Sequence, residues 1–192
     1  MVGARTVGHD AGCSTDRGGG GDAVTRYVFD GRALLRETPQ RYHVVTHDLA
    51  ARVAETHDVD RVELKGLAER LEERNPDAVA TLAAAAEAEP VGWLDVAVDE
   101  PSEEVVNAAV RLLSESVTRF VLRSDGDAVY GRYDDGQVYV ALPGGVEPDV
   151  PDDLRDHLHR VERDVEDVAG GEITGGVLMA LMEETPDEED GA

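Results

Sequence analysis

The sequence predicts an α+β fold: an N-terminal helical group followed by a strand, a helix, a three-stranded antiparallel meander and C-terminal helices. Three observations support it. Apolar residues recur at helical spacing between residues 47 and 89. After Pro90 they alternate instead, as in Leu94, Val96 and Val98. Finally, two Asp-Gly pairs lie inside alternating segments, at 125–126 and 135–136, which is the strongest short-range signal of β-hairpins.

The chain of 192 residues is long enough for one domain with a substantial core. We expect that domain to span residues 23–182, within which 46–89 could form a helical subdomain and 90–182 a β-α-β-β-β-α part. Residues 1–22 are rich in Gly, Ser, Thr and Asp, and residues 183–192 are strongly acidic. Both terminal segments are therefore predicted to be disordered tails.

The first half of the domain carries signals of two kinds. Tyr27 and Phe29 alternate, as do Tyr42 and Val44, which predicts two short strands around residues 30–40. Three closely linked helices are then expected within residues 47–89. The first comprises Leu49, Ala50 and Val53 and ends near His57; the second starts with the capping-box-like pair Asp60 and Glu63 and continues through Leu64, Leu67, Ala68 and Leu71; the third is capped by Asn75 and has Pro76 at its first position.

The two Asp-Gly turns predict the register of the meander. A two-residue type I′ turn at each pair places Ser124 opposite Asp127, and Asp134 opposite Gln137. Counting outward gives one apolar face, made of Phe120, Leu122, Val129, Gly131, Tyr133, Val138, Val140 and Leu142. Gly131 leaves room on that face for an aromatic ring or a closely packed helix. The opposite face receives Arg119, Val121, Arg123, Ala128, Tyr130, Arg132, Tyr139 and Ala141.

This second face is the candidate ligand or partner site. Its key residues are Arg119, Arg123, Arg132, Tyr130 and Tyr139. Guanidinium groups bind carboxylates or phosphates in pairs and stack on aromatic rings. A solvated sheet face, or one covered by another layer or subunit, is the alternative interpretation.

The region after the meander predicts a candidate association helix. Five apolar residues follow a 4-3-4-3 spacing, which is typical of a helix lying along a partner: Leu154, Leu158, Val161, Val165 and Val168. Packing against the sheet and a dimer seam are both compatible with this spacing. A helix from Ser102 to Ser116 precedes the meander, and a last short helix is expected from Ile173 to Glu184.

The composition constrains the solvent more than the reaction. The net charge is -24, and Lys65 is the single lysine, yet 41% of the residues are hydrophobic, so the chain should fold. This composition resembles that of halophilic, and in particular haloarchaeal, proteins, which implies a cytoplasm of molar salt. The N-terminus lacks the apolar segment of a signal peptide, and no run is long enough for a membrane span, so a cytoplasmic protein without membrane contact is expected.

Signals of catalysis are weak. The lone Cys13 lies in a polar, glycine-rich segment, and the six histidines lack the spacing of a metal site. We therefore predict no catalytic residue, no metal and no cofactor. The leading hypothesis is a non-enzymatic binding or interaction module for a partner protein or small anionic ligand, with self-association through the Leu154 to Val168 helix as a further option.

Two alternatives remain open. The helices before Pro90 have helix-turn-helix proportions, and Arg61, Lys65 and Arg70 would contact DNA, although the balanced charges of the second helix disfavour nucleic acid. The other alternative is an enzyme of unrecognised type. The order of elements over about 80 residues resembles profilin-like and roadblock/longin-like scaffolds, which implies a binding or dimerisation module.

Overall fold

The computed structural model describes residues 24–114, 116–133, 136–165, 168 and 173–183. They form one antiparallel sheet of seven strands in the order β3-β2-β4-β5-β6-β1-β7. The strands are β1 (Val24–Asp30), β2 (Arg61–Leu67), β3 (Trp93–Asp99), β4 (Val117–Ser124), β5 (Asp127–Tyr133), β6 (Gln137–Pro143) and β7 (Leu158–Val161). The helices are α1 (Arg32–Glu37), α2 (Pro39–Thr56), α3 (Ala68–Arg74), α4 (Pro76–Ala85), α5 (Glu103–Arg111), the 3-10 helix η1 (Asp152–His157) and α7 (Gly175–Glu183).

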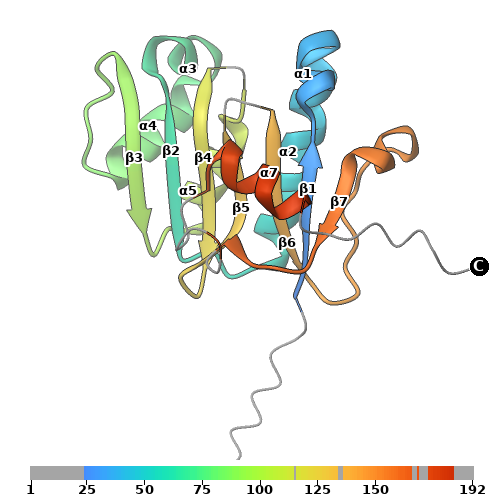
Figure 1. Ribbon diagram of the computed structural model, residues 1–192. Helices are drawn as coiled ribbons and strands as arrows, with labels where there is room; N and C mark the ends of the chain where they lie inside the picture. Colours follow the sequence, from blue (N-terminus) through green and yellow to red (C-terminus); the bar gives the residue numbers. More distant parts are fainter. Residues whose placement is uncertain (1–23, 115, 134–135, 166–167, 169–172, 184–192) are drawn as a thin grey trace, which may run out of the picture.

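The helices cover the two faces of the sheet unequally. On the inner face, α2 packs on β5 and β6, α5 on β2, and α4 on β3. On the outer face, α7 packs on β1, β6 and β7 (Figure 1). Because β2 and β3 carry no helix on their outer side in the part of the chain that the structure describes, the sheet is a two-layer structure there.

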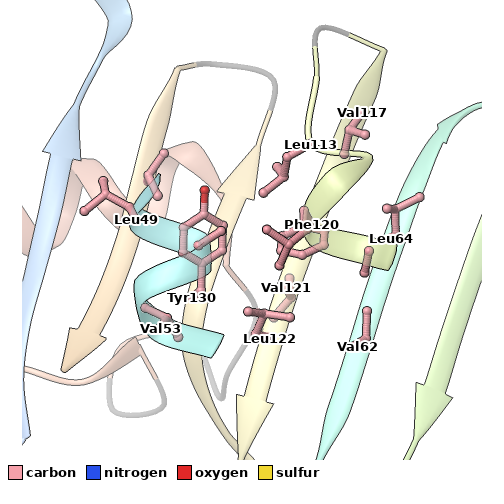
Figure 2. Packing of buried hydrophobic residues seen from close by; sticks show 14 of the residues in the cluster. Leu49, Val53, Val62, Leu64, Leu113, Val117, Phe120, Val121, Leu122 and Tyr130 are labelled. Carbon is pink, nitrogen blue, oxygen red and sulfur yellow. The ribbon is translucent and has the colours of Figure 1, made fainter. Parts of the chain in front are cut away.

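The hydrophobic core lies between the sheet and the inner helices. Leu64 and Phe120 pair across β2 and β4, and Leu49 of α2 packs opposite them with Tyr130 of β5 (Figure 2). The strict alternation of buried and exposed residues in β3 confirms the predicted strand and assigns its apolar side to this core. A strand with one face in the core and the other in solvent has just this pattern.

The predicted α+β class is confirmed, whereas the predicted sheet arrangement is not. The sheet has seven strands rather than three, and the expected meander, β4-β5-β6, lies at its centre. Of the two strands predicted before residue 45, only β1 exists. Tyr42 and Val44 belong to α2, because Tyr42, Val45 and Leu49 recur at helical spacing and are buried together.

The second helix of the predicted N-terminal group is wrong over its first half. Residues 61–67 form β2, a central strand between β3 and β4, and the helix α3 begins only at Ala68. Val62 and Leu64 are buried at strand spacing, and this tertiary pairing overrides the helical capping signal. The third helix is confirmed: the Asn75 side chain accepts a hydrogen bond from the Ala78 amide at 3.2 Å, and Pro76 follows it.

One irregularity changes the predicted register of the meander. Ser124 pairs with Asp127 as predicted, and the turn residues Asp125 and Gly126 both have positive φ. A β-bulge between Leu122 and Arg123 then shifts the pairing, so that Leu122 lies opposite Tyr130 rather than Val129. The second predicted turn involves residues 134–135, which lie outside the described residues.

The shift reverses the faces of β5. Tyr130 and Arg132 point to the inner face, and Gly131 and Tyr133 to the outer face, whereas β4 and β6 keep their predicted faces. The space predicted at Gly131 is used, because a Cβ there would lie 2.3 Å from Cδ1 of Ile173, just before α7. Gly131 therefore admits an isoleucine side chain on the outer face rather than a ring on the inner face.

The predicted association helix does not form as one helix. Leu154 lies in η1, and Leu158 and Val161 lie in β7, which pairs with β1 at the sheet edge. Leu154, Val161 and Val165 are buried within their own chain. The 4-3-4-3 spacing thus arises from separate elements that each contribute to the core. Among the described residues no helix is both long and apolar enough to cross a membrane.

Candidate functional site

The predicted Arg/Tyr face is divided by the bulge between two sides of the sheet. Arg119 and Arg123 lie on the outer face of β4, as predicted. Tyr139 also lies on the outer face but is fully buried. Tyr130 and Arg132, by contrast, are buried on the inner face, with 0% and 3% of their surfaces exposed. The five residues therefore do not form one site.

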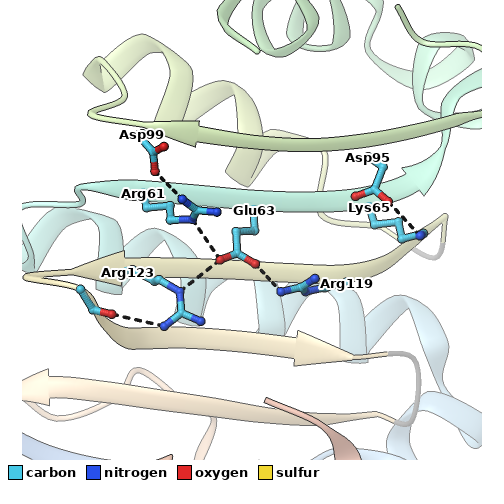
Figure 3. A network of polar contacts seen from close by, with 8 residues as sticks. Arg61, Glu63, Lys65, Asp95, Asp99, Arg119 and Arg123 are labelled. Atoms are coloured by element: carbon cyan, nitrogen blue, oxygen red, sulfur yellow. Dashed lines mark hydrogen bonds and ion pairs between the residues drawn. The ribbon is translucent and has the colours of Figure 1, made fainter. Parts of the chain in front are cut away.

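The outer side of β3, β2 and β4 forms a surface that we call the open face. Its described residues are Trp93, Asp95, Ala97 and Asp99 of β3, Arg61, Glu63, Lys65 and Leu67 of β2, and Arg119, Val121 and Arg123 of β4. Figure 3 shows the polar members of this set side by side across the three strands. Because residues 61–67 were predicted to be helical, the position of Arg61, Glu63 and Lys65 beside the two arginines of β4 was not foreseen.

Glu63 is the centre of the open face. Its carboxylate accepts hydrogen bonds from Arg123 Nε at 3.1 Å, from Arg61 Nε at 3.2 Å, and from Arg119 Nη2 (Figure 3). Only 12% of the Glu63 side chain is exposed. One carboxylate thus orients three guanidinium groups that come from two neighbouring strands.

The charge state of Glu63 follows from two opposing effects. Burial alone would raise the pKa of Glu63, but the hydrogen bond from Arg123 and the charges of Arg119 and Arg123 outweigh it. The pKa of Glu63 is therefore lower than its ordinary value, and the carboxylate is ionised at neutral pH.

The cations of the open face are unequally compensated. Arg61 also donates to Asp99 at 2.6 Å, and Lys65 donates to Asp95 at 2.9 Å. Among the described residues Arg119 forms an ion pair only with Glu63, and its Nε is buried without a hydrogen-bond partner. Of its side chain, 40% is exposed. Positive charge is therefore least neutralised at Arg119.

Apolar side chains lie at the end of the open face nearest Lys65. Trp93 is the single tryptophan of the chain and is 46% exposed. It lies opposite Leu67, which is 40% exposed, and next to Val91, which is 80% exposed. Trp93 was not among the predicted site residues, although a lone tryptophan at the start of an alternating strand was a usable signal.

The remaining aromatic residues of the predicted site have structural partners. The Tyr139 hydroxyl lies 3.5 Å from Asp164, which also accepts a hydrogen bond from Arg26 Nε at 2.8 Å. The Tyr130 hydroxyl donates to the carbonyl oxygen of Thr46 at 2.9 Å. Burial raises the pKa of both phenols well above the ordinary value, so both stay neutral and hydrogen-bonded.

The histidines in the described part of the chain do not converge on one site. His43 and His47 are one turn apart on α2, whereas His57 follows α2 and its Nε2 lies 2.9 Å from the carbonyl oxygen of Ala141. His157 packs edge-on near Phe29, and His159 lies on β7. Within the described ranges no group of three or more His, Cys, Asp or Glu residues is placed to hold a metal ion. Cys13 lies outside these ranges.

The predicted helix-turn-helix is wrong. Arg61 and Lys65, which would have contacted DNA from a recognition helix, lie on the central strand β2 and are paired with carboxylates. Only Arg70 lies on a helix, the seven-residue α3, and it pairs with Glu73. A strand in the middle of a sheet cannot enter the major groove as a recognition helix does.

Comparisons with known proteins found no relative whose function could be compared with that of this chain. No family model matches the chain, and neither the curated proteins nor the solved structures contain a significant match.

Proposed function

We propose that this protein is a non-enzymatic interaction module that binds an acidic segment of a partner protein on its open face. The observation that carries the proposal is the exposure of Trp93 on the same sheet face as three clustered arginines. Tryptophan and arginine are the residues most enriched among those that dominate binding energy at protein interfaces. The composition further supports placing this module in a cytoplasm of molar salt.

Charge complementarity selects an acidic partner. The open face carries four basic side chains, Arg61, Lys65, Arg119 and Arg123, against the three carboxylates Glu63, Asp95 and Asp99. The chain as a whole has a net charge of -24. At molar salt the Debye length is about 3 Å, so repulsion from the rest of the surface is screened while contact ion pairs persist. A carboxylate segment can therefore approach Arg119 directly.

Glu63 prepares the arginines for such a partner. It fixes the orientation of three guanidinium groups, which reduces the side-chain entropy that binding must overcome. Because Arg119 contacts Glu63 through Nη2 and 40% of its side chain is exposed, part of its guanidinium group stays accessible to a partner. Trp93 and Leu67 supply the apolar area that a purely ionic contact lacks, since exposed ion pairs contribute little by themselves.

The test combines two substitutions, Trp93→Ser and Arg119→Gln, in one variant. Both side chains are partly exposed, so the fold should be retained. The control is Arg111→Gln, an exposed arginine at the end of α5 on the helix side of the sheet. Each chain is cross-linked in cells of the source organism at roughly molar KCl, where the Debye length is about 3 Å. The attached proteins are then identified by mass spectrometry.

We expect a partner with an acidic segment to be recovered with the native chain and with the Arg111 control. The double variant should recover at least tenfold less, on the order of 1.4 kcal/mol of binding free energy. Equal recovery by all three chains would rule out the open face. If light scattering shows that the native chain is a dimer and the double variant a monomer, the open face binds a second copy of this chain rather than an acidic partner. That result would contradict the proposal.

A further inference from the structure

Arg132 is a buried arginine near the end of β5. It is the second-last residue of that strand and points to the inner face, where it lies between Phe120 and Val138 in the register. Only 3% of its surface is exposed. Since a guanidinium group does not lose its proton in a protein, Arg132 places a full positive charge in the core layer.

The guanidinium group lacks the acceptors that a structural arginine has. Nε and Nη1, which carry three of its five N–H bonds, are buried without a hydrogen-bond partner in the described part of the chain. No carboxylate there is recorded in an ion pair with Arg132, whereas Glu63, Asp99 and Asp164 each pair with other arginines. Within the described residues, the one contact that addresses its charge is the ring of Tyr42, whose centroid lies 5.4 Å from Cζ.

The surroundings hold Arg132 in place without satisfying it. The Tyr42 ring is itself fixed, because a Cβ at Gly31 would lie 2.6 Å from it. The nearby Tyr130 hydroxyl is already used by the Thr46 carbonyl group. A cation–π contact offsets only part of the cost of an unpaired buried charge, since such a contact contributes on the order of 2 kcal/mol and the desolvation penalty is several kcal/mol.

From this geometry we propose that Arg132 is the anchor of a binding site for a small oxyanion of the carboxylate or phosphate class. Planar pairs of N–H groups match the oxygen atoms of such anions, which a single-atom halide does not. This site lies on the inner face and is independent of the partner surface proposed on the open face.

The test compares the native chain with Arg132→Met, an unbranched apolar side chain of similar length. Melting temperatures are measured in KCl with added potassium phosphate or potassium acetate at constant total potassium. Phosphate stabilises folded proteins generally, so the informative quantity is the difference between the two chains. At a concentration ten times the Kd, bound anion should raise the Tm of the native chain by roughly 3–6 °C more than that of the variant.

A second expectation separates a binding arginine from a structural one. Without added oxyanion, Arg132→Met should melt at a higher temperature than the native chain, because replacing an unpaired buried charge by an apolar side chain removes its desolvation penalty. A lower Tm of the variant, together with equal phosphate and acetate shifts in both chains, would assign Arg132 a structural role and overturn the proposal.

Direct detection keeps the proposal testable if the variant fails to fold. The Nε–H resonance of Arg132 is assigned by its loss in Arg132→Lys. In the native chain its chemical shift should change and reach saturation as phosphate or acetate is added. The anion that binds with the higher affinity shows whether the site prefers phosphates or carboxylates. Asp134 and Asp135 follow Arg132 in the sequence and are the rival counter-charge. The proposal of an external anion would be contradicted if the resonance does not move on titration and the double variant Asp134→Asn/Asp135→Asn is less stable than the native chain only when Arg132 is present.

Discussion

At the scale of single residues, Glu63 determines whether the open face is a stable surface. It accepts hydrogen bonds from three arginines and is 12% exposed, so its removal leaves guanidinium donors without an acceptor. We expect Glu63→Gln to lower the free energy of unfolding by about 1–3 kcal/mol. Urea unfolding at fixed salt measures this change. Glu55→Gln, at an exposed pair with Arg52, is the control and should change stability by less than about 0.5 kcal/mol.

The pH dependence of this effect has a definite sign. The pKa of Glu63 is lowered from an ordinary value of 4.5, so the folded state binds its proton less readily than the unfolded state does. The stabilisation is therefore complete above that ordinary value and is lost as the pH falls through the folded-state pKa. The stability difference between the native chain and Glu63→Gln should be constant from neutral pH to about 5 and should shrink below that. A difference that grows on acidification would contradict the assigned direction.

At the scale of elements, Gly131 determines how closely the segment before α7 approaches the sheet. A Cβ at this position would lie 2.3 Å from Ile173 Cδ1 and 3.1 Å from its Cγ2. Gly131→Ala should therefore destabilise the protein by roughly 1–3 kcal/mol through overpacking. Ile173→Val removes Cδ1, and in the double variant the cost of the alanine should fall measurably. Additive effects of the two substitutions would show that α7 approaches through other contacts.

Elements with complete local signals could be predicted from the sequence. The alternation of β3, the Asn75 cap of α4 and the Asp125-Gly126 turn each depend on residues close in the chain, and each was found where predicted. Strand β2 was missed because its position between β3 and β4 is a long-range property. The capping-box spacing of Asp60 and Glu63 is a local signal that this pairing overrides.

The candidate sites were harder to predict than the elements, for one physical reason. Side chains alternate with period two along a strand, so one extra residue in a bulge moves the residues that follow it on that strand to the opposite face. The bulge between Leu122 and Arg123 moved Tyr130 and Arg132 from the predicted ligand face into the core layer. The prediction that Arg119 and Arg123 share a face was right because the extra residue of the bulge, Val129, lies on β5 and leaves the even spacing of the two arginines along β4 unchanged.

At the scale of the whole molecule, charge is distributed unevenly between the sheet and the rest of the surface. The net charge of the chain is -24, yet the open face has four basic side chains and three acidic ones. Elsewhere in the part of the chain that the structure describes, exposed carboxylates lie on helices and loops, as Glu72, Glu89 and Glu147 illustrate. Such a surface disfavours the compact state through mutual repulsion unless salt screens it.

The salt dependence of stability follows from this distribution. The Debye length grows from about 3 Å at 1 M to about 10 Å at 0.1 M, a range that spans neighbouring carboxylates on one surface. We expect the Tm to fall by roughly 10 °C when KCl is lowered from molar to 0.1 M, on the order of 3 kcal/mol for a chain of this size. Replacing Glu72, Glu89 and Glu147 by glutamine should reduce that fall, because each substitution removes one repelling charge without breaking a recorded ion pair. Equal melting temperatures at both salt concentrations would show that the acidic surface is not an adaptation to molar salt. If the Tm of the glutamine variant falls by as much as that of the native chain, the salt effect arises from stronger hydrophobic burial instead.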